Sequence, residues 1–460
     1  MSCLVMKFGG SSLDGAERLR QVANLVRRNL DGAPLVVLSA MGKTTDALFA
    51  MARAAEQGDL EQALLRHWEV ASRHRKVADE LFDGATPEDL EKAFQELFNQ
   101  LELLLKGVAM LRDLSPRSMD AIASVGERLS TRLFAAYMAH RRSDVSWVDA
   151  RKVLRTDERF GEAQPNMSAL RLLAQEHLAT LLDAGRVVVT QGYIGATAEG
   201  ITTTLGRGGS DYSAALFGYA LRATEVQIWT DVEGVLTCDP RVVPSAQPIA
   251  ELSFAEAAEL AAFGAKVLHP ATIQPAVEAG IPVTVRHTQR PEGSFSTITE
   301  HVVTGRAVTA LASRGPVTVL TVTSSRMLAQ SGFLARLFEV FRRHRVSVDL
   351  IATAEVSVSM TVEPDAPVAD LITDLSDFAH VERAEGKAIV AVVGERLRQT
   401  PGVCSRVFTA MADVNVEMIS MGANEVNLSL VLAAGDVPEA LRRLHRVLIE
   451  EAPFTSEVAP

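Results

Sequence analysis

The sequence predicts an α/β protein, in which a domain built on a buried, largely parallel sheet precedes two copies of a small β-α-β-β-α-β module. Two observations predict this fold. In the first 300 residues, short apolar segments alternate with helical patterns, which is typical of buried parallel strands joined by helices. After about residue 310 the elements become shorter, and one pattern occurs twice. A chain of 460 residues is also long enough for two or three domains.

The first elements predict a β-α-β unit. Two apolar segments, residues 3–8 and 35–39, flank a stretch in which Leu19, Val22 and Val26 share one helical face. Further apolar segments, each bounded by polar or glycine residues, predict more strands of the same sheet. These segments are residues 187–190, 226–230 and 281–285.

Two helical regions are predicted within this domain. Residues 44–114 contain almost no glycine and favour helix, so we expect a helical excursion packed on the sheet. Further along, Ser253 and Glu256 have the S-x-x-E spacing of a capping box ahead of an alanine-rich run. A helix should therefore begin there and end near Gly264.

The C-terminal third contains an internal repeat. Gly332 and Phe338 recur 70 residues later as Gly402 and Phe408. The predicted strand at residues 346–351 recurs 68 residues later. Because both offsets are nearly the same, we expect two copies of one small module.

Composition excludes several classes of protein. The formal charge of −11 argues against a nucleic-acid surface, and no apolar run approaches the ~20 residues that span a bilayer. We therefore expect neither a nucleic-acid nor a membrane partner. Cys3, Cys238 and Cys404 lie far apart without a C-x-x-C pair, so neither a disulfide framework nor a zinc site is indicated. No secretion signal is recognised after Met1, and a reducing cytoplasm is the expected location.

A lysine and two glycines end the first predicted strand. Lys7 precedes Gly9 and Gly10, in a turn whose backbone N–H groups can approach phosphate oxygens without interference from a Cβ atom. An ordinary turn between a strand and a helix could have the same sequence. A second segment, residues 202–211, combines three glycines with an arginine, hydroxyl groups and a carboxylate before a helical run. The pair of segments predicts a cradle for phosphate.

Gly42-Lys43-Thr44 resembles the end of a Walker A loop, but that motif requires a glycine at the position of Val37. We therefore expect the nucleotide to be held by several separate loops at the carboxyl edge of the sheet. Lysines would neutralise the transferring phosphoryl group.

Three further polar segments have plain structural interpretations when taken singly. Asp239-Pro240-Arg241 is typical of a turn. Lys266 lies near a predicted helix end, where a lysine complements the helix dipole. His269 precedes a proline and is interpreted as a packed or capping residue rather than a general base.

Taken together, the order and spacing of these segments resemble the amino acid kinase superfamily and, within it, the aspartate kinases. The resemblance extends from the N-terminus to about residue 450. Its segments are residues 7–12, 37–40, 126–130, 191–195, 202–211, 229–231 and 263–270. The C-terminal repeat resembles a tandem of ACT domains, and its segments 331–334 and 347–351 are most similar to the lysine-sensitive, single-function type. No dehydrogenase or decarboxylase extension is expected.

The resemblance implies a three-layer αβα domain over residues 1–300, the amino acid kinase fold. Two ferredoxin-like βαββαβ ACT domains are expected to follow, over residues 310–385 and 386–455. An exchange of strands between these two ACT domains is also expected.

The resemblance further implies ATP-dependent phosphorylation of the β-carboxylate of L-aspartate to 4-phospho-L-aspartate, the first step of lysine, threonine and methionine biosynthesis. By position, it assigns catalysis to Lys7 and Asp211. The residues assigned to aspartate are Ser39, Thr45, Glu127, Arg207 and Ser210. Those assigned to ATP are Lys7, Gly9, Gly10, Ser11, Thr230, Asp231, Leu236, Arg241 and Lys266. Mg²⁺ is expected mainly on the ATP phosphates, with Asp211 nearby and no direct side-chain ligand.

The chemistry of these residue types agrees with the implied roles. Arg207 can pair bidentately with an α-carboxylate, and Glu127 can pair with an α-ammonium group. The β-carboxylate is then free to attack. Because a carboxylate with a pKa near ~4 is ionised at neutral pH, no general base is needed. Catalysis can consist of positioning and charge neutralisation.

The resemblance places an L-lysine effector between ACT domains of paired subunits, which implies a homodimer or homotetramer. The residues assigned to lysine are Met327, Gly332, Phe333, Ser347, Val348, Asp349, Thr353 and Glu355. Asp349 and Glu355 suit ammonium groups, although they could also merely flank an exposed strand. Ala354 replaces a serine that is usual in the lysine-sensitive pattern, and Leu236 replaces a tyrosine that often contacts adenine. We therefore expect weakened lysine binding and an aliphatic contact to the base.

Two alternatives stay open at this point. Another kinase of the same fold would act on acetylglutamate, glutamate or a nucleoside monophosphate, but Glu127 and Arg207 favour a free amino acid. A catalytically silent lysine sensor would keep the fold for binding alone. Lys7, Asp211 and Lys266 argue against it.

Overall fold

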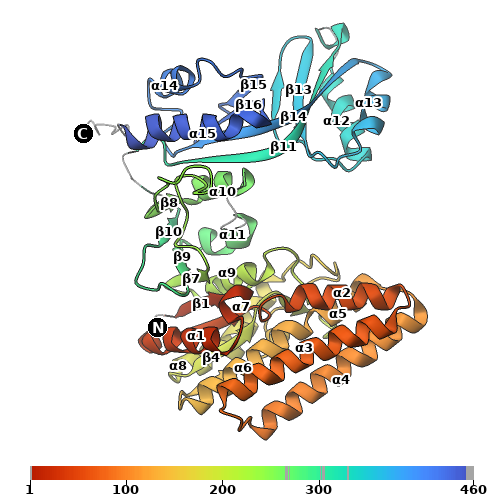
Figure 1. Cartoon of the computed structure of the whole chain (residues 1–460), viewed down its shortest axis with the longest axis vertical. Coiled ribbons are helices and arrows are strands. Elements are labelled where there is room, and N and C mark those ends of the chain that lie inside the picture. Colours follow the sequence, from red (N-terminus) through yellow and green to blue (C-terminus); the bar gives the residue numbers. More distant parts are fainter. Residues whose placement is uncertain are drawn as a thin grey trace. The chain divides into compact units, whose positions relative to one another are not determined.

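The computed structural model describes residues 3–264, 268, 270–300, 302, 306–328 and 331–451 (Figure 1). The chain forms two compact units. The first consists of Met1–Val235 and Leu268–Glu300, and the second of Leu236–Val267 and His301–Pro460. The predicted α/β class is confirmed. Leu236–Val267 belongs to the second unit although it precedes residue 300 in the sequence.

The sheet of the first unit is almost entirely parallel. Its strands follow the spatial order β3 (Val145–Trp147), β4 (Val187–Gln191), β2 (Pro34–Leu38), β1 (Leu4–Phe8), β7 (Glu225–Thr230), β9 (Val283–His287) and β10 (Ser296–Thr299). Only β10 runs antiparallel to its neighbour β9. A separate hairpin is formed by β5 (Ile194–Ala196) and β6 (Thr202–Thr204). All five strands that we predicted for this unit are present, with their ends shifted by at most two residues.

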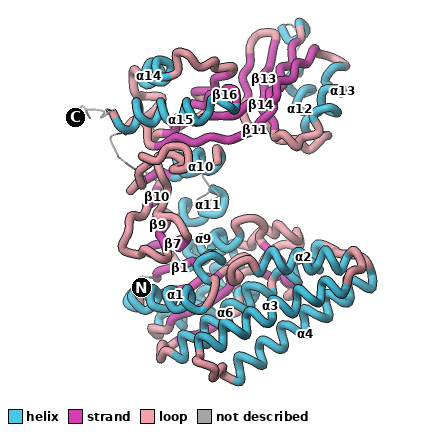
Figure 2. The backbone as a smooth tube through the Cα atoms, in the orientation of Figure 1, coloured by secondary structure: helices cyan, strands magenta, loops and turns pink. Residues whose placement is uncertain are grey.

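Helices of the first unit pack against this sheet. They are α1 (Ala16–Arg28), α2 (Thr44–Glu56), α3 (Leu60–Leu81), α4 (Glu88–Leu111), α5 (Pro116–Ala123), α6 (Val125–His140), α7 (Met167–Ala174), α8 (Thr180–Asp183), α9 (Gly209–Leu221) and α11 (Pro270–Glu278). Figure 2 shows α3, α4 and α6 running side by side. The predicted helical excursion is confirmed as α2, α3 and α4, whose apolar faces join β1 and β2 in one buried core.

The sheet of the second unit has the strand order β12 (Ile351–Thr353), β13 (Ser357–Val362), β11 (Ala310–Thr323), β14 (His380–Val393), β16 (Asn427–Ala433) and β15 (Met418–Met421). Its helices are α12 (Phe333–Arg343), α13 (Val368–Ser376), α14 (Val403–Ala410) and α15 (Val437–His445). The predicted pair of β-α-β-β-α-β modules is present in this unit.

Two long strands are shared between the modules. The second half of β11 pairs with β13 in the first module, from Thr318 to Thr323. Its first half, Ala310–Arg314, pairs with the part of β14 that belongs to the second module. A register shift after Arg314 separates the two halves. Each module therefore has four strands, two of which are segments of the long strands β11 and β14 that both modules share.

The glycines of the internal repeat lie at the start of the first helix of each module. Gly332 and Gly402 cap α12 and α14, and both have positive φ angles, 92° and 85°. A side chain at such a position would strain the backbone, which explains why glycine recurs. The aromatic residues of the repeat, Phe338 and Phe408, are similarly exposed, at 38% and 37%.

The strand predicted at residues 346–351 is wrong in extent, because β12 begins only at Ile351. The Leu350 N–H donates to the Thr361 hydroxyl, at 3.0 Å, instead of to a backbone carbonyl. Thr361 also accepts a backbone hydrogen bond from Asp349 at 3.1 Å and donates one to the Leu350 carbonyl at 3.0 Å, so two residues face one and the pairing is irregular at this point. Val346 and Val348 pack against the core of the module from a loop.

The capping box predicted at Ser253 is confirmed. The Glu256 N–H donates to the Ser253 hydroxyl at 3.2 Å, and the Ser253 N–H donates to the Glu256 carboxylate at 2.8 Å. This cap starts α10 (Phe254–Ala262), directly after β8 (Glu251–Ser253).

The segment before β8 packs against the second ACT-like module. Cys238 and Val243 belong to the same buried cluster as the apolar face of α15. The Thr237 hydroxyl also contacts Nε2 of His445 at 2.8 Å, and both side chains are buried. These contacts explain why residues 236–267 group with the C-terminal unit.

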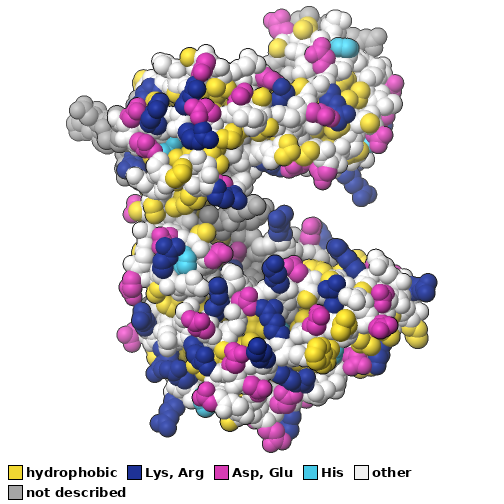
Figure 3. Space-filling model, viewed as in Figure 1, with side chains coloured by type: hydrophobic (Ala, Val, Ile, Leu, Met, Phe, Trp, Pro, Cys, Tyr) yellow, Lys and Arg dark blue, Asp and Glu magenta, His cyan; other side chains and the backbone are white. Residues whose placement is uncertain are grey.

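Basic and acidic side chains alternate over both units on the face drawn in Figure 3. None of the described helices is long and apolar enough to cross a membrane.

Candidate functional site

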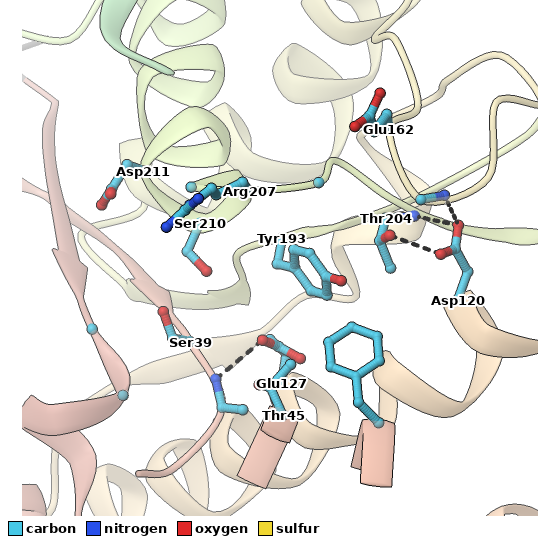
Figure 4. Close-up of a pocket in the computed structure, with 18 of the residues that line it drawn as sticks. Ser39, Thr45, Asp120, Glu127, Glu162, Tyr193, Thr204, Arg207, Ser210 and Asp211 are labelled. Carbon is cyan, nitrogen blue, oxygen red and sulfur yellow. Dashed lines mark hydrogen bonds between the residues drawn. The ribbon is translucent and has the colours of Figure 1, made fainter. Parts of the chain in front are cut away.

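A cavity of about 550 Å³ lies at the carboxyl ends of β1 and β2 in the first unit (Figure 4). The loops after these strands meet there with the start of α9 and with α6. Nine residues selected from the sequence line this cavity: Lys7, Gly9, Gly10, Ser39, Thr45, Glu127, Arg207, Ser210 and Asp211. The residues assigned to aspartate and to catalysis therefore share one cavity, although up to 204 positions separate them in the sequence.

Lys7 and Asp211 form an ion pair at one end of this cavity. The Nζ–Oδ1 distance is 2.6 Å, and only 10% and 18% of the two side chains are exposed. Lys7 is fixed by strand β1, and Asp211 lies in the first turn of α9. Because both partners are shielded from water, the pair holds the ammonium group of Lys7 in a defined position.

Two glycines allow the loops to approach closely. A Cβ atom on Gly10 would lie 2.7 Å from the carbonyl oxygen of Gly42. A Cβ atom on Gly192 would lie 2.7 Å from Cβ of Ser210. The turns after β1 and β4 therefore tolerate no side chain at Gly10 and at Gly192. The N-terminus of α9 adds the positive end of a helix dipole to this region.

Glu127 is buried at the base of the cavity, in the first turn of α6. Its Oε1 accepts a hydrogen bond from the Ala40 N–H at 3.2 Å, as Figure 4 shows. Its Oε2 is buried without a hydrogen-bond partner among the described residues. Burial raises the pKa of the Glu127 carboxyl to about 8, although the hydrogen bond from Ala40 acts in the opposite direction. The carboxylate is thus incompletely satisfied and suited to a ligand cation.

Arg207 lies in the glycine-rich turn between β6 and α9, and it is exposed toward the cavity (Figure 4). No carboxylate of the described chain forms an ion pair with it. Its planar guanidinium group is therefore available for bidentate contact with a carboxylate ligand. Glu127 and Arg207 together provide one anionic and one cationic group for a small zwitterion.

The cavity also contains residues that the sequence did not single out. Asp120, within α5, is buried, and it accepts hydrogen bonds from the N–H and hydroxyl groups of Thr204, both at 2.8 Å. It also accepts one from the Gly161 N–H at 3.0 Å. Burial raises the pKa of the Asp120 carboxyl, while these hydrogen bonds limit the rise. Asp120 fixes the strand that leads into the glycine-rich turn.

Tyr193 is a second residue without an assigned role. Its φ angle is +68°, which is uncommon for a residue with a side chain. Its ring lies beside Glu127 and Thr204 in Figure 4, and burial raises the pKa of its hydroxyl to about 12. It lies in the segment 191–195 of the family resemblance, but no local pattern in the sequence marks it as a site residue. Glu162 also lines the cavity.

The remaining residues assigned to ATP in the first unit lie outside the lining of this cavity. Ser11 is exposed, and its carbonyl accepts a hydrogen bond from Arg18 at 2.6 Å. Thr230 ends β7, the strand beside β1, and its hydroxyl donates to Asp231 at 3.1 Å. Thr230 and Asp231 therefore lie at the same edge of the sheet as Lys7.

The other residues assigned to ATP belong to different parts of the chain. Leu236 and Arg241 are in the second unit, where Leu236 bridges to Pro248 and Arg241 forms a bidentate ion pair with Asp239. Lys266 lies outside the described residues.

The residues assigned to an effector belong to the first ACT-like module. Met327 precedes α12, Gly332 and Phe333 start it, and residues 347–349 lie in the loop after it. Thr353 ends β12, and Glu355 lies in the turn that follows. Phe333, however, is buried and packs against Phe378 at a ring distance of 5.8 Å, so it contributes mainly to the core.

Asp349 is the most distinctive residue of this set. Its Oδ1 lies 3.0 Å from Nη1 of Arg314. Its Oδ2 is buried and has no hydrogen-bond partner within the described chain. Burial raises the pKa of the Asp349 carboxyl, although the charge of Arg314 acts against this rise. One oxygen is therefore still available to a donor.

Comparisons with known proteins agree with this fold and site. The model of the amino acid kinase family matches residues 2–287, and an ACT domain model matches residues 390–448. Lysine-sensitive aspartokinase 3 of Escherichia coli is 39% identical, over 97% of this chain and 99% of its own length.

Two solved structures are also similar. The Escherichia coli aspartokinase III complex with aspartate and ADP (R-state) has a TM-score of 0.83 and 38% identity, covering 98% of this chain and 100% of that one. The complex of the same enzyme with lysine and aspartate (T-state) has a TM-score of 0.82 and 39% identity, covering 97% and 100%.

Proposed function

The chain belongs to the amino acid kinase family and, within it, to the aspartate kinases, and on this basis we propose the reaction and its control. The protein transfers the γ-phosphoryl group of ATP to the β-carboxylate of L-aspartate. The product is 4-phospho-L-aspartate, the first intermediate of lysine, threonine and methionine biosynthesis, and L-lysine inhibits the reaction. The observation that carries the catalytic part is the buried, unpartnered oxygen of Glu127, which suits the ammonium group of a free amino acid.

Recognition of aspartate uses the two charged groups of the cavity. The α-ammonium group pairs with Glu127. Burial raises the pKa of the Glu127 carboxyl in the free enzyme, and the positive charge of the ligand favours its ionised form. The α-carboxylate pairs with Arg207. The hydroxyl groups of Ser39, Thr45 and Ser210 line the same cavity and provide further hydrogen bonds. An N-acetylated substrate would lack the cation that Glu127 requires, which disfavours acetylglutamate.

Phosphoryl transfer uses the opposite end of the cavity. Lys7 and the backbone N–H groups of Gly9 and Gly10 hold the phosphates of ATP, while Asp211 positions the ammonium group of Lys7. The β-carboxylate attacks the γ-phosphorus, the bond to the β,γ-bridging oxygen breaks, and ADP leaves with the bonding electrons. No proton is transferred at the carboxylate, because it is ionised at neutral pH.

We expect Mg²⁺ to be carried mainly by the ATP phosphates, with no direct side-chain ligand and with Asp211, the carboxylate beside Lys7 in the cavity, nearby. When bound, Mg²⁺ neutralises phosphate charge.

The other residues that we assign to ATP binding, by position in the family, are Ser11, Thr230, Asp231, Leu236, Arg241 and Lys266. Thr230 and Asp231 support this assignment because they end the strand next to β1. Leu236 would contact the base through its aliphatic side chain.

Regulation by lysine is supported by Asp349. A buried carboxylate oxygen without a donor is suited to a ligand ammonium group. Ala354 lacks the hydroxyl group of the usual serine, so one hydrogen bond is missing. This loss costs about 0.5–1.5 kcal/mol and weakens lysine binding several-fold. Inhibition requires lysine to bind the inactive arrangement more tightly than the active one.

We further infer a cytoplasmic homodimer or homotetramer that assembles through the ACT domains. Apolar side chains are exposed on both modules, which supports association there. They are Leu334, Phe338 and Ile351 in the first module, and Phe408, Ile419 and Met421 in the second.

The proposal is tested by measuring ADP release with Mg·ATP and four separate acceptors: L-aspartate, L-glutamate, N-acetyl-L-glutamate and uridine monophosphate. We expect turnover with L-aspartate and little with the others, and we expect L-lysine to suppress it. Turnover unaffected by lysine would refute the effector assignment but leave the reaction intact. Absence of turnover with L-aspartate would refute the reaction.

A further inference from the structure

A second cavity in the first unit has no role in the proposed reaction. It measures about 310 Å³ and lies between α4, α6, β3 and the 3₁₀ turn Ala150–Lys152. Its lining shares no residue with the cavity that holds Glu127 and Lys7. It is therefore a separate site on the same domain.

The lining of this cavity is unusually cationic. Arg128 and Arg132 come from α6, and Arg151 and Lys152 come from the 3₁₀ turn. The only carboxylates in the lining are Glu96 and Asp149. Four positive and two negative side chains leave two positive charges without compensation.

The existing contacts neutralise only part of this charge. Asp149 is engaged by Arg151, with Oδ2–Nη2 at 2.6 Å and Oδ1–Nε at 3.0 Å. Arg128 donates to a neutral amide oxygen, that of Gln100, at 3.0 Å. No carboxylate of the described chain lies within ion-pair distance of Arg128.

The other two cations are also without an anionic partner at ion-pair distance among the described residues. The guanidinium carbon of Arg132 lies 3.5 Å from the ring centre of Trp147, so this cation is held against an aromatic face. Lys152 is exposed at the margin of the cavity.

Burial lowers the pKa of both Arg128 and Arg132. At Arg128, whose pKa falls to about 10, the positive charge of Arg151 adds to the effect of burial. At Arg132 the charges of Asp149 and Glu96 act in the opposite direction. A bound anion would therefore relieve charge repulsion mainly at Arg128.

We propose that this cavity binds a small dianion, with a phosphate group as the ligand chemistry. Two negative charges would balance the excess of the lining, and guanidinium groups donate to phosphate oxygens in bidentate geometry. The volume accommodates phosphate alone or a small phosphomonoester. Arg128 and Arg132 would contact the anion, and Arg151 would remain fixed by Asp149.

Trp147 provides a direct probe, because it lines the cavity beside Arg132. We would titrate the full chain with inorganic phosphate and follow tryptophan emission. Chloride would hold the ionic strength constant, and saturating Mg·ADP would occupy the phosphate-binding turns of the main cavity. The variants are Arg132→Gln, Arg128→Gln and Trp147→Phe. Arg27→Gln is the matched control, since Arg27 is an exposed arginine on α1.

The expected result is a saturable change in emission for the wild type and for Arg27→Gln. Arg132→Gln and Arg128→Gln should each weaken binding about tenfold, because each removes a charge-assisted contact. Trp147→Phe should remove the optical signal, while calorimetry still detects binding.

The proposal is overturned if phosphate causes no saturable change in emission or heat. It is also overturned if Arg132→Gln and Arg27→Gln weaken binding equally, because that outcome indicates only general electrostatic attraction. Since the experiment measures binding and not turnover, its outcome is independent of whether L-aspartate is the substrate.

Discussion

Glu127 occupies a position that is costly for an ionised side chain. It is buried, one of its oxygens has a single hydrogen bond from a backbone N–H, and the other has no partner in the described chain. The pKa of about 8 means that the free protein retains a proton there at neutral pH. A ligand ammonium group would remove this cost, and we propose that specificity for a free amino acid depends on this incompletely satisfied carboxylate.

Replacing Glu127 by glutamine tests this arrangement. The folded protein binds a proton at Glu127 up to about pH 8, whereas an unfolded glutamate loses it near its ordinary pKa of 4.5. Glu127 therefore lowers the free energy of unfolding of the wild type as pH rises from about 4.5 to about 8. The loss of stability is larger above pH 8 than at pH 6. We expect Glu127→Gln to be more stable than the wild type by about 2 kcal/mol at pH 6, which is about 1.5 units above the unfolded pKa. At pH 9 the difference should be on the order of 5 kcal/mol, so the advantage of the variant grows by about 3 kcal/mol between the two values of pH.

The same variant should raise KM for L-aspartate by about a hundredfold, because the ammonium group loses its anionic partner. Thermal unfolding at pH 6 and pH 9, together with steady-state kinetics, measures both effects. Glu69→Gln, an exposed change on α3, is the control. If the difference in stability between Glu127→Gln and the wild type is the same at pH 6 and at pH 9, Glu127 is already charged in the free protein.

Single residues differed in how well the sequence revealed them. Lys7, Glu127 and Arg207 lie in recognisable segments, and the structure brings them into one cavity. Asp120 and Tyr193 were missed. Asp120 has no local pattern around it, and its partner Thr204 is 84 positions away, so only the folded chain reveals the contact.

At the scale of elements, α5 and β6 are joined through one carboxylate. Asp120 on α5 holds both the backbone and the side chain of Thr204, the last residue of β6, and it also holds the turn at Gly161. The glycine-rich turn with Arg207 follows β6 directly. The position of Arg207 therefore depends on a helix that does not itself contact the α-carboxylate.

Asp120→Ala tests this dependence. Alanine has no acceptor, so all three hydrogen bonds from Thr204 and Gly161 are lost. We expect kcat/KM for L-aspartate to fall about tenfold, and amide exchange at Thr204 and Gly161 to accelerate. Asp113→Ala is a control, because Asp113 is exposed near the start of α5. Unchanged exchange and unchanged kinetics would contradict a positioning role for Asp120.

Elements were predicted well where periodicity is strong. The strands of the first unit, the helical excursion and the capping box at Ser253 appear where expected. The strand at residues 346–351 was overestimated because its alternating apolar residues pack from a loop. The side chain of Thr361 supplies a contact there that pattern analysis cannot detect.

At the scale of the whole molecule, the chain is not divided at one point in the sequence. Leu236–Val267 leaves the first unit, packs with the second through contacts such as Thr237 to His445, and then returns to α11 and β9. The sequence showed a boundary near residue 300 because composition changes there. The sequence did not show that Leu236–Val267 packs with the second unit, because this segment has the same alternation of strand and helix patterns as the first unit. Similarly, the sharing of β11 and β14 is visible only from their pairing.

The central claim is that one cavity holds L-aspartate so that its β-carboxylate receives the phosphoryl group. The most direct measurement incubates the full chain with Mg·ATP and L-aspartate in the presence of hydroxylamine, and identifies the hydroxamate that traps the acyl phosphate. The account predicts aspartate β-hydroxamate, formed in step with ADP release and lost in Glu127→Gln at moderate substrate concentration. ADP release without this product, or an α-hydroxamate, would contradict the assignment of Glu127 and Arg207.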